Sequence, residues 1–390
     1  MSMHYNIELT TVAGGYDRKT CWVHARAGVI PPSTAVLTTQ KLRLTGSDIF
    51  YALHSARSDD LGKSWSPLVK QDTLDRRPVG ERIEAVPCDF TPTWHAASGK
   101  LLGTGHSALY SDDELLEGPY PRQTVYAVYD AEADRWSEWK TLAMPDADRF
   151  FNAGAGCTQR VDLPDGDILL PIYFLDREES GGGAPPLYRA VVVRCRFDGT
   201  DLHYLEHGDE LCAPDPRGFC EPSLAAFAGR FFLTLRNDVR GYVARGDDGL
   251  HFAPPKPWTF DDGEELGNYN TQQHWLAHSD ALFLVYTRRG ANNDHIFRHR
   301  APLFMAQIDP DRLCVIRETE RIIIPERGAG LGNFGTAMIS RDESWVICSE
   351  WMQTVPPNWS DCTVCERYGS DNSIFVSRIR WEKPNRLVEW

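Results

Sequence analysis

Polar side chains flank apolar segments at several places in this chain of 390 residues, and their types suggest a chemistry. Asp89 and Glu221 are carboxylic acids that stand directly before apolar residues, and a pair of such groups can serve as acid and base on a glycosidic bond. Arg26 and Arg236 carry guanidinium groups, which bind carboxylates through paired and oriented hydrogen bonds. Brought together by the fold, these four residues would form a site that combines acid–base groups with donors for an anion.

The segments around these residues follow a repeated pattern. A small or polar start, an apolar strand, a short Gly or Asp turn and a second apolar strand recur along the chain. The starts are roughly 50–70 residues apart, which is enough for a four-stranded unit. Six copies are found, at residues 32–44, 91–106, 157–174, 222–237, 271–288 and 336–352.

The spacing and composition predict one all-β domain over residues 1–390, a six-bladed β-propeller. The many glycines, prolines and aromatic residues favour short strands and turns over long helices. Outer strands are expected at residues 123–130, 188–197 and 303–309. Residues 373–381 are expected to close the ring by pairing with residues 7–12, which removes an exposed sheet edge. Two β-sandwiches would need more even strand spacing and a linker, and no linker is found.

One octapeptide, Ser58-Asp59-Asp60-Leu61-Gly62-Lys63-Ser64-Trp65, has a specific turn chemistry. Asp60 can accept hydrogen bonds from turn amides, Gly62 can adopt a positive φ, and Trp65 can pack into an apolar slot as the next strand begins. The pattern S-x-D-x-G-x-S-W resembles the Asp-box, or BNR repeat, of the sialidase (neuraminidase) superfamily. Residues 134–136 and 246–252 are similar to eroded copies of it.

The resemblance to sialidases extends to the polar residues. Asp89, followed by Phe-Thr-Pro, looks like the acid/base aspartate of that family, and Glu221 in Cys-Glu-Pro-Ser looks like its glutamate. A closed, partly apolar cleft is expected to raise the pKa of Asp89 and let it protonate the leaving oxygen. The resemblance implies an exo-glycoside hydrolase that acts on a terminal, carboxylate-bearing sugar.

The family also uses three arginines to bind the substrate carboxylate. Arg26, in Arg-Ala-Gly-Val-Ile-Pro, stands where the family has Arg-Ile-Pro, although residues are inserted here. Arg236 is similar to the second arginine, and Arg288 or Arg289 occupies the place of the third. His106, Asn152 and His274 lie near the same expected mouth and are further candidates for substrate binding.

One departure from the family concerns the tyrosine nucleophile. Phe334 stands where that tyrosine is expected, and Tyr269, before the fifth repeat, could replace it only if its loop reaches across the mouth. Three alternatives therefore stay open. Glu221 and Asp89 could invert a glycoside by activating water directly. The protein could be a polysaccharide lyase or a rhamnosidase-like enzyme acting next to a uronic acid, with histidines and tyrosines moving protons. It could also be a carbohydrate-binding propeller without catalysis.

The overall charge of the chain limits the classes of molecule that it is expected to bind. A net charge of −14 disfavours nucleic acids, since these need a basic surface, but a few focused arginines can still attract an acidic glycan.

No signal peptide or membrane-spanning stretch is seen, so a cytoplasmic protein is expected. The ten cysteines, including the Cys362-x-x-Cys365 pair, are expected to be free thiols, and no cofactor or metal is predicted. The stretch 288–300 has four arginines and two histidines and could reach over the mouth or remain a solvated loop.

Overall fold

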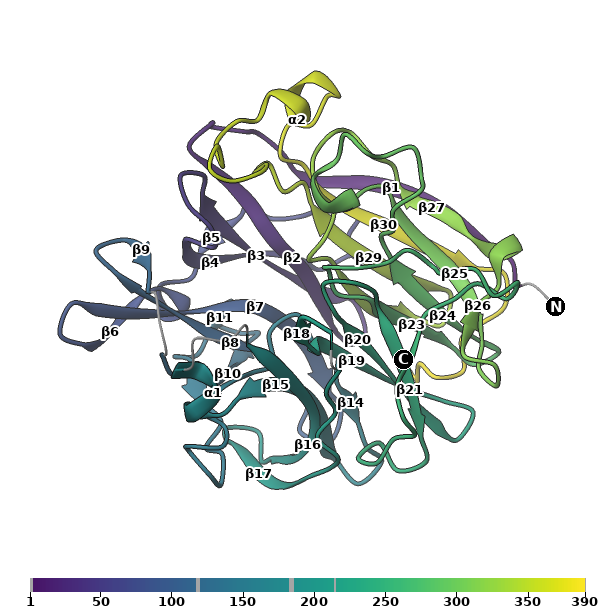
Figure 1. Cartoon of the computed structure of the whole chain (residues 1–390), viewed down its shortest axis with the longest axis horizontal. Coiled ribbons are helices and arrows are strands. Elements are labelled where there is room, and N and C mark those ends of the chain that lie inside the picture. Colours follow the sequence, from purple (N-terminus) through teal and green to yellow (C-terminus); the bar gives the residue numbers. More distant parts are fainter. Residues whose placement is uncertain (1–2, 117–119, 182–185, 214, 390) are drawn as a thin grey trace.

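The computed structural model describes residues 3–116, 120–181, 186–213 and 215–389, and these residues form six mainly antiparallel sheets (Figure 1). The first sheet contains β2 (Thr20–Ile30), β3 (Thr34–Arg43), β4 (Phe50–Ser58) and β5 (Val69–Lys70). The second contains β6 (Arg77–Gly80), β7 (Ile83–His95), β8 (Lys100–Ser111), β9 (Glu114–Leu115), β10 (Thr124–Asp130), β11 (Arg135–Trp136) and β12 (Lys140–Thr141). The third contains β13 (Asn152–Gly154), β14 (Val161–Asp162), β15 (Asp167–Leu175), β16 (Leu187–Phe197), β17 (Leu202–His207) and β18 (Arg217–Gly218).

The remaining sheets follow the same plan. The fourth contains β19 (Cys220–Phe227), β20 (Arg230–Arg236), β21 (Tyr242–Gly246) and β22 (Lys256–Pro257). The fifth contains β23 (His274–His278), β24 (Ala281–Tyr286), β25 (Leu303–Asp309), β26 (Cys314–Val315) and β27 (Arg321–Ile324). The sixth contains β28 (Gly335–Ser340), β29 (Glu343–Ser349), β30 (Ile374–Trp381) and β1 (Tyr5–Ala13). In the described part of the chain, no helix is long and apolar enough to cross a membrane, and α1 (Arg177–Gly181) and α2 (Thr363–Arg367) have five residues each.

The sheets are joined in a ring, as expected of a β-propeller. Neighbouring sheets contact each other through β2 and β7, β8 and β13, β15 and β19, β19 and β23, and β23 and β28, and the contact of β28 with β2 completes the circle. The predicted closure is confirmed, because β1 pairs with β30 in antiparallel register, with Ile7 opposite Ile379. The first and last strands of the chain therefore share one sheet, in which β1 is the outermost strand.

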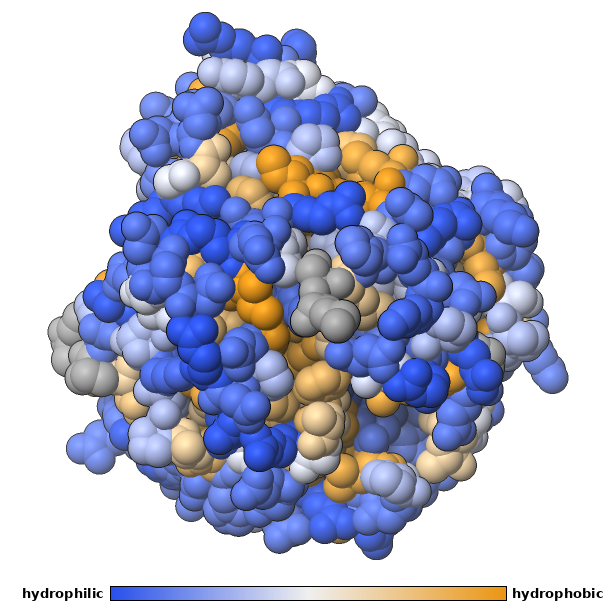
Figure 2. Space-filling model, turned by 90° about the vertical axis from the view of Figure 1, so that its right-hand side faces the viewer, coloured by the Kyte–Doolittle hydropathy of each residue, from blue (hydrophilic) through white to orange (hydrophobic). Residues whose placement is uncertain are grey.

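The hydrophobic core is divided among the junctions between sheets. Each of the larger buried clusters draws its side chains from two neighbouring sheets; Leu276 and Phe283 of the fifth sheet, for example, pack with Val346 and Phe375 of the sixth. On the face shown in Figure 2 hydrophilic residues cover most of the surface, and apolar residues appear in smaller groups between them. Apolar burial thus fixes each sheet against the next one and so fixes the loops at the centre of the ring.

Five of the six predicted repeats are hairpins that lie at the inner end of a sheet, as in β7–β8 and β19–β20. The unit predicted at residues 32–44 is different. The innermost hairpin of that sheet is β2–β3, and Pro31 and Pro32 form its turn instead of preceding its first strand. Prolines fit both places because they cannot donate to a sheet, so the sequence pattern was ambiguous here.

The octapeptide forms the turn that its residues predict. The Ser58 hydroxyl accepts a hydrogen bond from the Gly62 amide at 2.7 Å, and Asp60 Oδ1 accepts one from the Ser64 amide at 2.9 Å. Gly62 has a φ of +75°, and a Cβ at this position would lie 2.7 Å from the ring of Trp345 in the sixth sheet. Trp65 packs against that same ring, with 5.9 Å between centroids. It does not begin a strand, since β5 starts only at Val69.

Candidate active site

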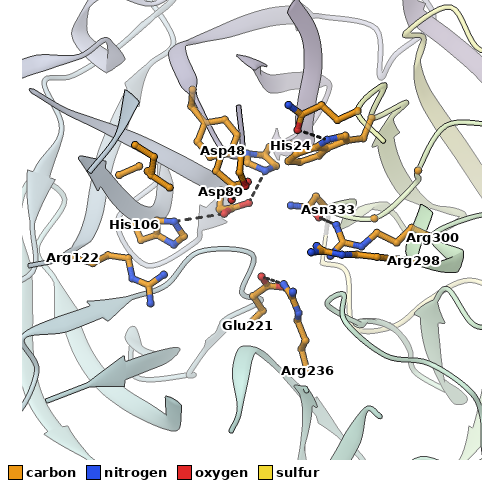
Figure 3. Close-up of a pocket in the computed structure, with 18 of the residues that line it drawn as sticks. His24, Asp48, Asp89, His106, Arg122, Glu221, Arg236, Arg298, Arg300 and Asn333 are labelled. Atoms are coloured by element: carbon orange, nitrogen blue, oxygen red, sulfur yellow. Dashed lines mark hydrogen bonds and ion pairs between the residues drawn. The ribbon is translucent and has the colours of Figure 1, made fainter. Parts of the chain in front are cut away.

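A cavity of about 360 Å³ opens at the centre of the ring (Figure 3). Every one of the six sheets, or a loop next to it, contributes to its wall. The residues that matter for chemistry are charged, aromatic or amide side chains: His24, Asp89, His106, Arg122, Tyr173, Tyr188, Arg217, Glu221, Arg236, Arg298, Arg300 and Asn333. The cavity is therefore strongly polar, and arginines are its most frequent charged residues.

A left-handed backbone residue lies in or near the innermost strand of each sheet. These residues are His24, Asp89, Cys157, Glu221, Asn270 and Asn333, with φ values of +56°, +52°, +54°, +44°, +52° and +65°. In β2, β7 and β19 the strand register shifts at this residue. Such a conformation costs about 1–2 kcal/mol for a residue with a Cβ, and it is retained where it aims a side chain. Here it brings polar side chains from the sheets toward the centre of the ring.

Asp89 lies among four groups that favour its ionised form. His24 Nε2 is 3.0 Å from Oδ1 of Asp89, and His106 Nε2 is 3.6 Å from Oδ2. The Cys157 thiol donates to Oδ1 at 2.7 Å, and Nη2 of Arg26 is 3.6 Å from the same oxygen. Burial alone would raise the pKa of Asp89, but His24, His106, Arg26 and the Cys157 hydrogen bond together lower it.

This result corrects the expected electrostatics of Asp89. A raised pKa was predicted from a partly apolar cleft, and that prediction is wrong because the neighbours of Asp89 are donors and cations. Burial lowers the pKa of His24, and burial together with Arg122 lowers the pKa of His106 to about 3. The two imidazoles are therefore neutral near pH 7, and Asp89 is a carboxylate that can orient their N–H groups.

His106 links Asp89 to a tyrosine. On its other side, His106 Nδ1 is 3.4 Å from the hydroxyl of Tyr173, which also accepts a hydrogen bond from Nη1 of Arg122 at 3.1 Å. Burial raises the pKa of Tyr173 well above its usual value, so its hydroxyl keeps its proton. Asp89, His106 and Tyr173 thus form a chain from a carboxylate to a phenol at the cavity wall.

Glu221 and Arg236 form a buried ion pair beside the cavity. Nη1 of Arg236 donates to Oε1 of Glu221, and its Nη2 donates to the Asn270 side chain at 2.9 Å. The second carboxylate oxygen of Glu221, Oε2, has no hydrogen-bond partner among the described residues. An unpaired buried oxygen is costly, so this atom is available to accept a proton or a hydrogen bond from a ligand.

Three cavity arginines have no carboxylate within 4.0 Å in the described ranges: Arg122, Arg298 and Arg300. Arg300 is held by Asn270 and by Asn333, whose Oδ1 lies 3.4 Å from Nη1. Burial and the neighbouring Arg236 and Arg298 lower the pKa of Arg300 to about 9. Buried cations that repel one another create a site that favours an anion.

Of the predicted residues, Asp89, His106, Glu221 and Arg236 line the cavity. Arg26 does not, since it is 1% exposed and lies beneath the wall, where its Nη2 donates to the Cys157 sulfur at 2.9 Å. The expected three-arginine clamp is therefore not formed from the predicted set.

The expected third arginine is also absent from the wall. Arg288 pairs with Glu320 at 2.7 Å, and Arg289 donates to the Val239 carbonyl at 2.9 Å. Instead, Arg298 and Arg300 of the same arginine-rich stretch reach the cavity. The composition of residues 288–300 was the only sequence signal for them.

Three other predicted residues lie outside the wall. The hydroxyl of Tyr269 is 2.5 Å from His299 Nδ1, and the Asn152 side chain donates to the Tyr120 carbonyl at 3.3 Å. His274 is 2.8 Å from the Ser223 hydroxyl and packs edge-on against Phe334, which is fully buried. The tyrosine in the cavity nearest to His106 is Tyr173, from the third repeat.

One group of three potential metal ligands occurs in the described part of the chain, formed by Cys88, Asp89 and His106 within 4.8 Å of one another. Burial raises the pKa of the Cys88 thiol well above its usual value, and its sulfur lies 3.5 Å from the His106 carbonyl.

Comparisons with known proteins place the fold. No family model matches the sequence, and no curated protein matches it. A protein of unknown function from Dyadobacter fermentans has a similar structure, with 14% identity, a TM-score of 0.62, and coverage of 96% of this chain and 99% of that one. Trypanosoma rangeli sialidase in complex with sialic acid is similar at 10% identity and a TM-score of 0.60, over 97% of this chain and 59% of that one.

A phage phi92 endosialidase is also similar, with 11% identity, a TM-score of 0.56, and coverage of 99% of this chain and 70% of that one. At these identities the likeness establishes an all-β, sialidase-like β-propeller. The activity has to be argued from the cavity itself.

Proposed function

We propose that this protein is a six-bladed β-propeller, each sheet being one blade, and a glycoside hydrolase that removes a terminal, carboxylate-bearing sugar. The observation that carries the proposal is the meeting of the Asp89–His106–Tyr173 chain with the unpaired Arg298 and Arg300 in one cavity. The arginines supply a place for the sugar carboxylate, and the chain supplies a positioned proton. The sialidase-like fold of the neighbours supports this class of substrate.

Different cavity residues carry out the separate steps of the proposed hydrolysis. Oε2 of Glu221 takes a proton from water as that water attacks the anomeric carbon. The glycosidic bond breaks, and the leaving oxygen takes the proton of Tyr173, while Nη1 of Arg122 stabilises the phenolate. Asp89 keeps a role in this scheme, but as a carboxylate that orients His24 and His106 and not as the acid. Direct attack by water inverts the configuration at the sugar.

Turnover of sialyl and uronyl glycosides by the purified protein tests the proposal. Glu221→Gln and Tyr173→Phe are expected to lower turnover by about 100-fold or more, the usual contribution of a general acid or base. Tyr126→Phe is the matched control, since its hydroxyl contacts Asp201 and lies outside the cavity wall. Unchanged turnover in both site variants would refute the mechanism. Binding of these sugars without turnover would instead support a carbohydrate-binding propeller.

A second candidate reaction, β-elimination, is favoured by one observation. The hydroxyl of Tyr173 contacts the neutral imidazole of His106 on one side and the guanidinium of Arg122 on the other. An imidazole, a phenol and a guanidinium are the groups that β-elimination next to a uronic acid requires. Elimination leaves an unsaturated sugar that absorbs in the ultraviolet, whereas hydrolysis adds water and produces no such absorbance. Mass spectrometry and absorbance of the same reaction mixture therefore separate the two reactions.

A further inference from the structure

The cavity carries positive charge on two opposite walls. Arg300 precedes β25 in the fifth sheet and contacts Asn333 beside the sixth sheet. Arg122 precedes β10 in the second sheet and contacts Tyr173 in the third. In a closed ring of six sheets these two junctions face each other. Figure 3 shows Arg122 on one side of the cavity and Arg298 and Arg300 on the other.

Arg122 has the geometry of an anion-binding group. Its guanidinium lies over the rings of Tyr173 and Tyr188, 4.4 and 5.2 Å from their centroids, and these contacts fix its plane. Nη1 is used by the Tyr173 hydroxyl, but Nε and Nη2 are covered from water and have no hydrogen-bond partner in the described chain. Nε and Nη2 form one edge of the guanidinium, the pair of donors that binds a carboxylate through two parallel bonds.

Arg122 lies apart from Arg298 and Arg300, the arginines proposed to bind the carboxylate of the terminal sugar. Figure 3 shows Asp89 and Glu221 between Arg122 on one side and Arg298 and Arg300 on the other, so carboxylates bound by the two sets of arginines would lie on different sides of the cavity. A covered, unpartnered donor edge also costs stability, and a bound anion offsets that cost. The chain nevertheless keeps this arginine in a protein whose net charge is −14, and none of the described residues places a carboxylate within 4.0 Å of it.

We infer that Arg122 forms a second anion subsite and that the substrate contains two adjacent carboxylated sugars, one bound by Arg298 and Arg300 and the next by Arg122. The bond between the two sugars then lies near Glu221 and Tyr173. This inference rests on the proposed function, because it names the substrate class of the same cavity. It excludes a substrate whose only charge is on its terminal sugar.

Matched disaccharides test the second subsite. The probes are disaccharides of two glucuronates, two galacturonates or two mannuronates, each compared with the same disaccharide in which one carboxyl is reduced to an alcohol. Calorimetry on the intact protein gives the ratio of the two dissociation constants. We expect at least one pair in which the two-carboxylate form binds about tenfold or more tightly, the usual effect of a charged hydrogen bond.

Variants of Arg122 test whether this residue causes the tighter binding of the two-carboxylate disaccharide. Arg122→Gln is expected to remove it, and Arg122→Lys, which keeps the charge but loses the paired donors, is expected to retain only part of it. Arg135→Gln removes an exposed arginine of β11 and is expected to keep it in full. Thermal unfolding of each variant confirms that it is folded. No preference in any wild-type pair, or the same preference in Arg122→Gln as in Arg135→Gln, would overturn the inference.

The two proposals fail in different ways. Cleavage of singly carboxylated glycosides without a preference for a second carboxylate would remove the second subsite and leave the proposed hydrolase intact. A preference that depends on Arg122, in a protein that cleaves none of the sugars, would support the subsite and contradict the hydrolase.

Discussion

Arg236 and Glu221 form an ion pair across the innermost hairpin of the fourth sheet, with side chains only 5% and 8% exposed. A second, partly buried pair, Arg288 with Glu320, lies away from the cavity, with side chains 17% and 14% exposed. The two pairs have the same chemistry, so they separate the structural cost of breaking an ion pair from its effect on function.

We therefore predict different outcomes for Arg236→Gln and Arg288→Gln. Both leave a glutamate without its partner, which costs about 3–5 kcal/mol for a buried pair, with the larger loss expected at Arg236 because it is more buried. Urea unfolding measures this loss. Only Arg236→Gln is expected to weaken binding of a carboxylated sugar as well. Equal binding by the two variants would show that Arg236 serves the fold alone.

The unpaired arginines lead to a prediction about stability without ligand. Arg298 and Arg236 both line the cavity, Arg298 is not in an ion pair in the described residues, and burial and Arg236 lower the pKa of Arg298. Arg298→Gln removes this repulsion and is expected to raise stability by about 0.5 kcal/mol or more while weakening binding of a carboxylated sugar. Thermal unfolding with and without the sugar measures both effects. A variant that is less stable than the wild type would show that Arg298 is not under strain.

The sequence predicted more of the fold than of the site. The hairpins could be predicted because apolar strands and Gly or Asp turns alternate locally, and the ring closure because an unpaired first strand would leave an edge. Asp89 and Glu221 were found because they stand next to innermost strands. The sequence did not show that β2 has a left-handed residue at His24, which turns His24 to the cavity and leaves Arg26 beneath it.

The arginines of the cavity could not be derived from strand patterns. Arg298 and Arg300 lie in and next to a short 3-10 turn, Phe297–His299, between β24 and β25. Arg122 lies just before β10, with no motif around it. Their positions depend on how distant loops meet above the ring, for example through the contact of Arg300 with Asn333. Contacts of this kind have no local period and appear only in three dimensions.

Buried histidines predict how stability depends on pH. Burial lowers the pKa of His274 from its usual value to about 3. Between that value and about 6.5 the unfolded chain binds a proton at this residue and the folded chain does not, so stability rises with pH and is lost as the pH falls. The slope is at most about 1.4 kcal/mol per pH unit for one histidine. His274→Gln is expected to flatten the curve of unfolding free energy between pH 4 and 6.5.

His4→Gln is the control for this measurement, because the side chain of His4 is exposed and its replacement is expected to leave the slope as it is. Urea unfolding at several pH values gives the two curves. If His274→Gln shows the same slope as the wild type, then His274 is protonated to the same extent in the folded and unfolded chains, and the loss of stability in acid comes from other groups.

The octapeptide turn gives a prediction based on two glycines. Gly62 and Gly99 both have positive φ values, +75° and +64°, so alanine is strained at either position, by roughly 1 kcal/mol. The two glycines differ in their surroundings. A Cβ at Gly62 would lie 2.7 Å from the Trp345 ring, whereas a Cβ at Gly99 would have no described atom of a neighbouring residue within 4 Å. Gly62→Ala is therefore expected to cost about 1–3 kcal/mol more than Gly99→Ala, because it also forces the first sheet away from the sixth. Urea unfolding of the two variants measures the difference, and equal losses would show that the packing of the turn on Trp345 does not hold these sheets together.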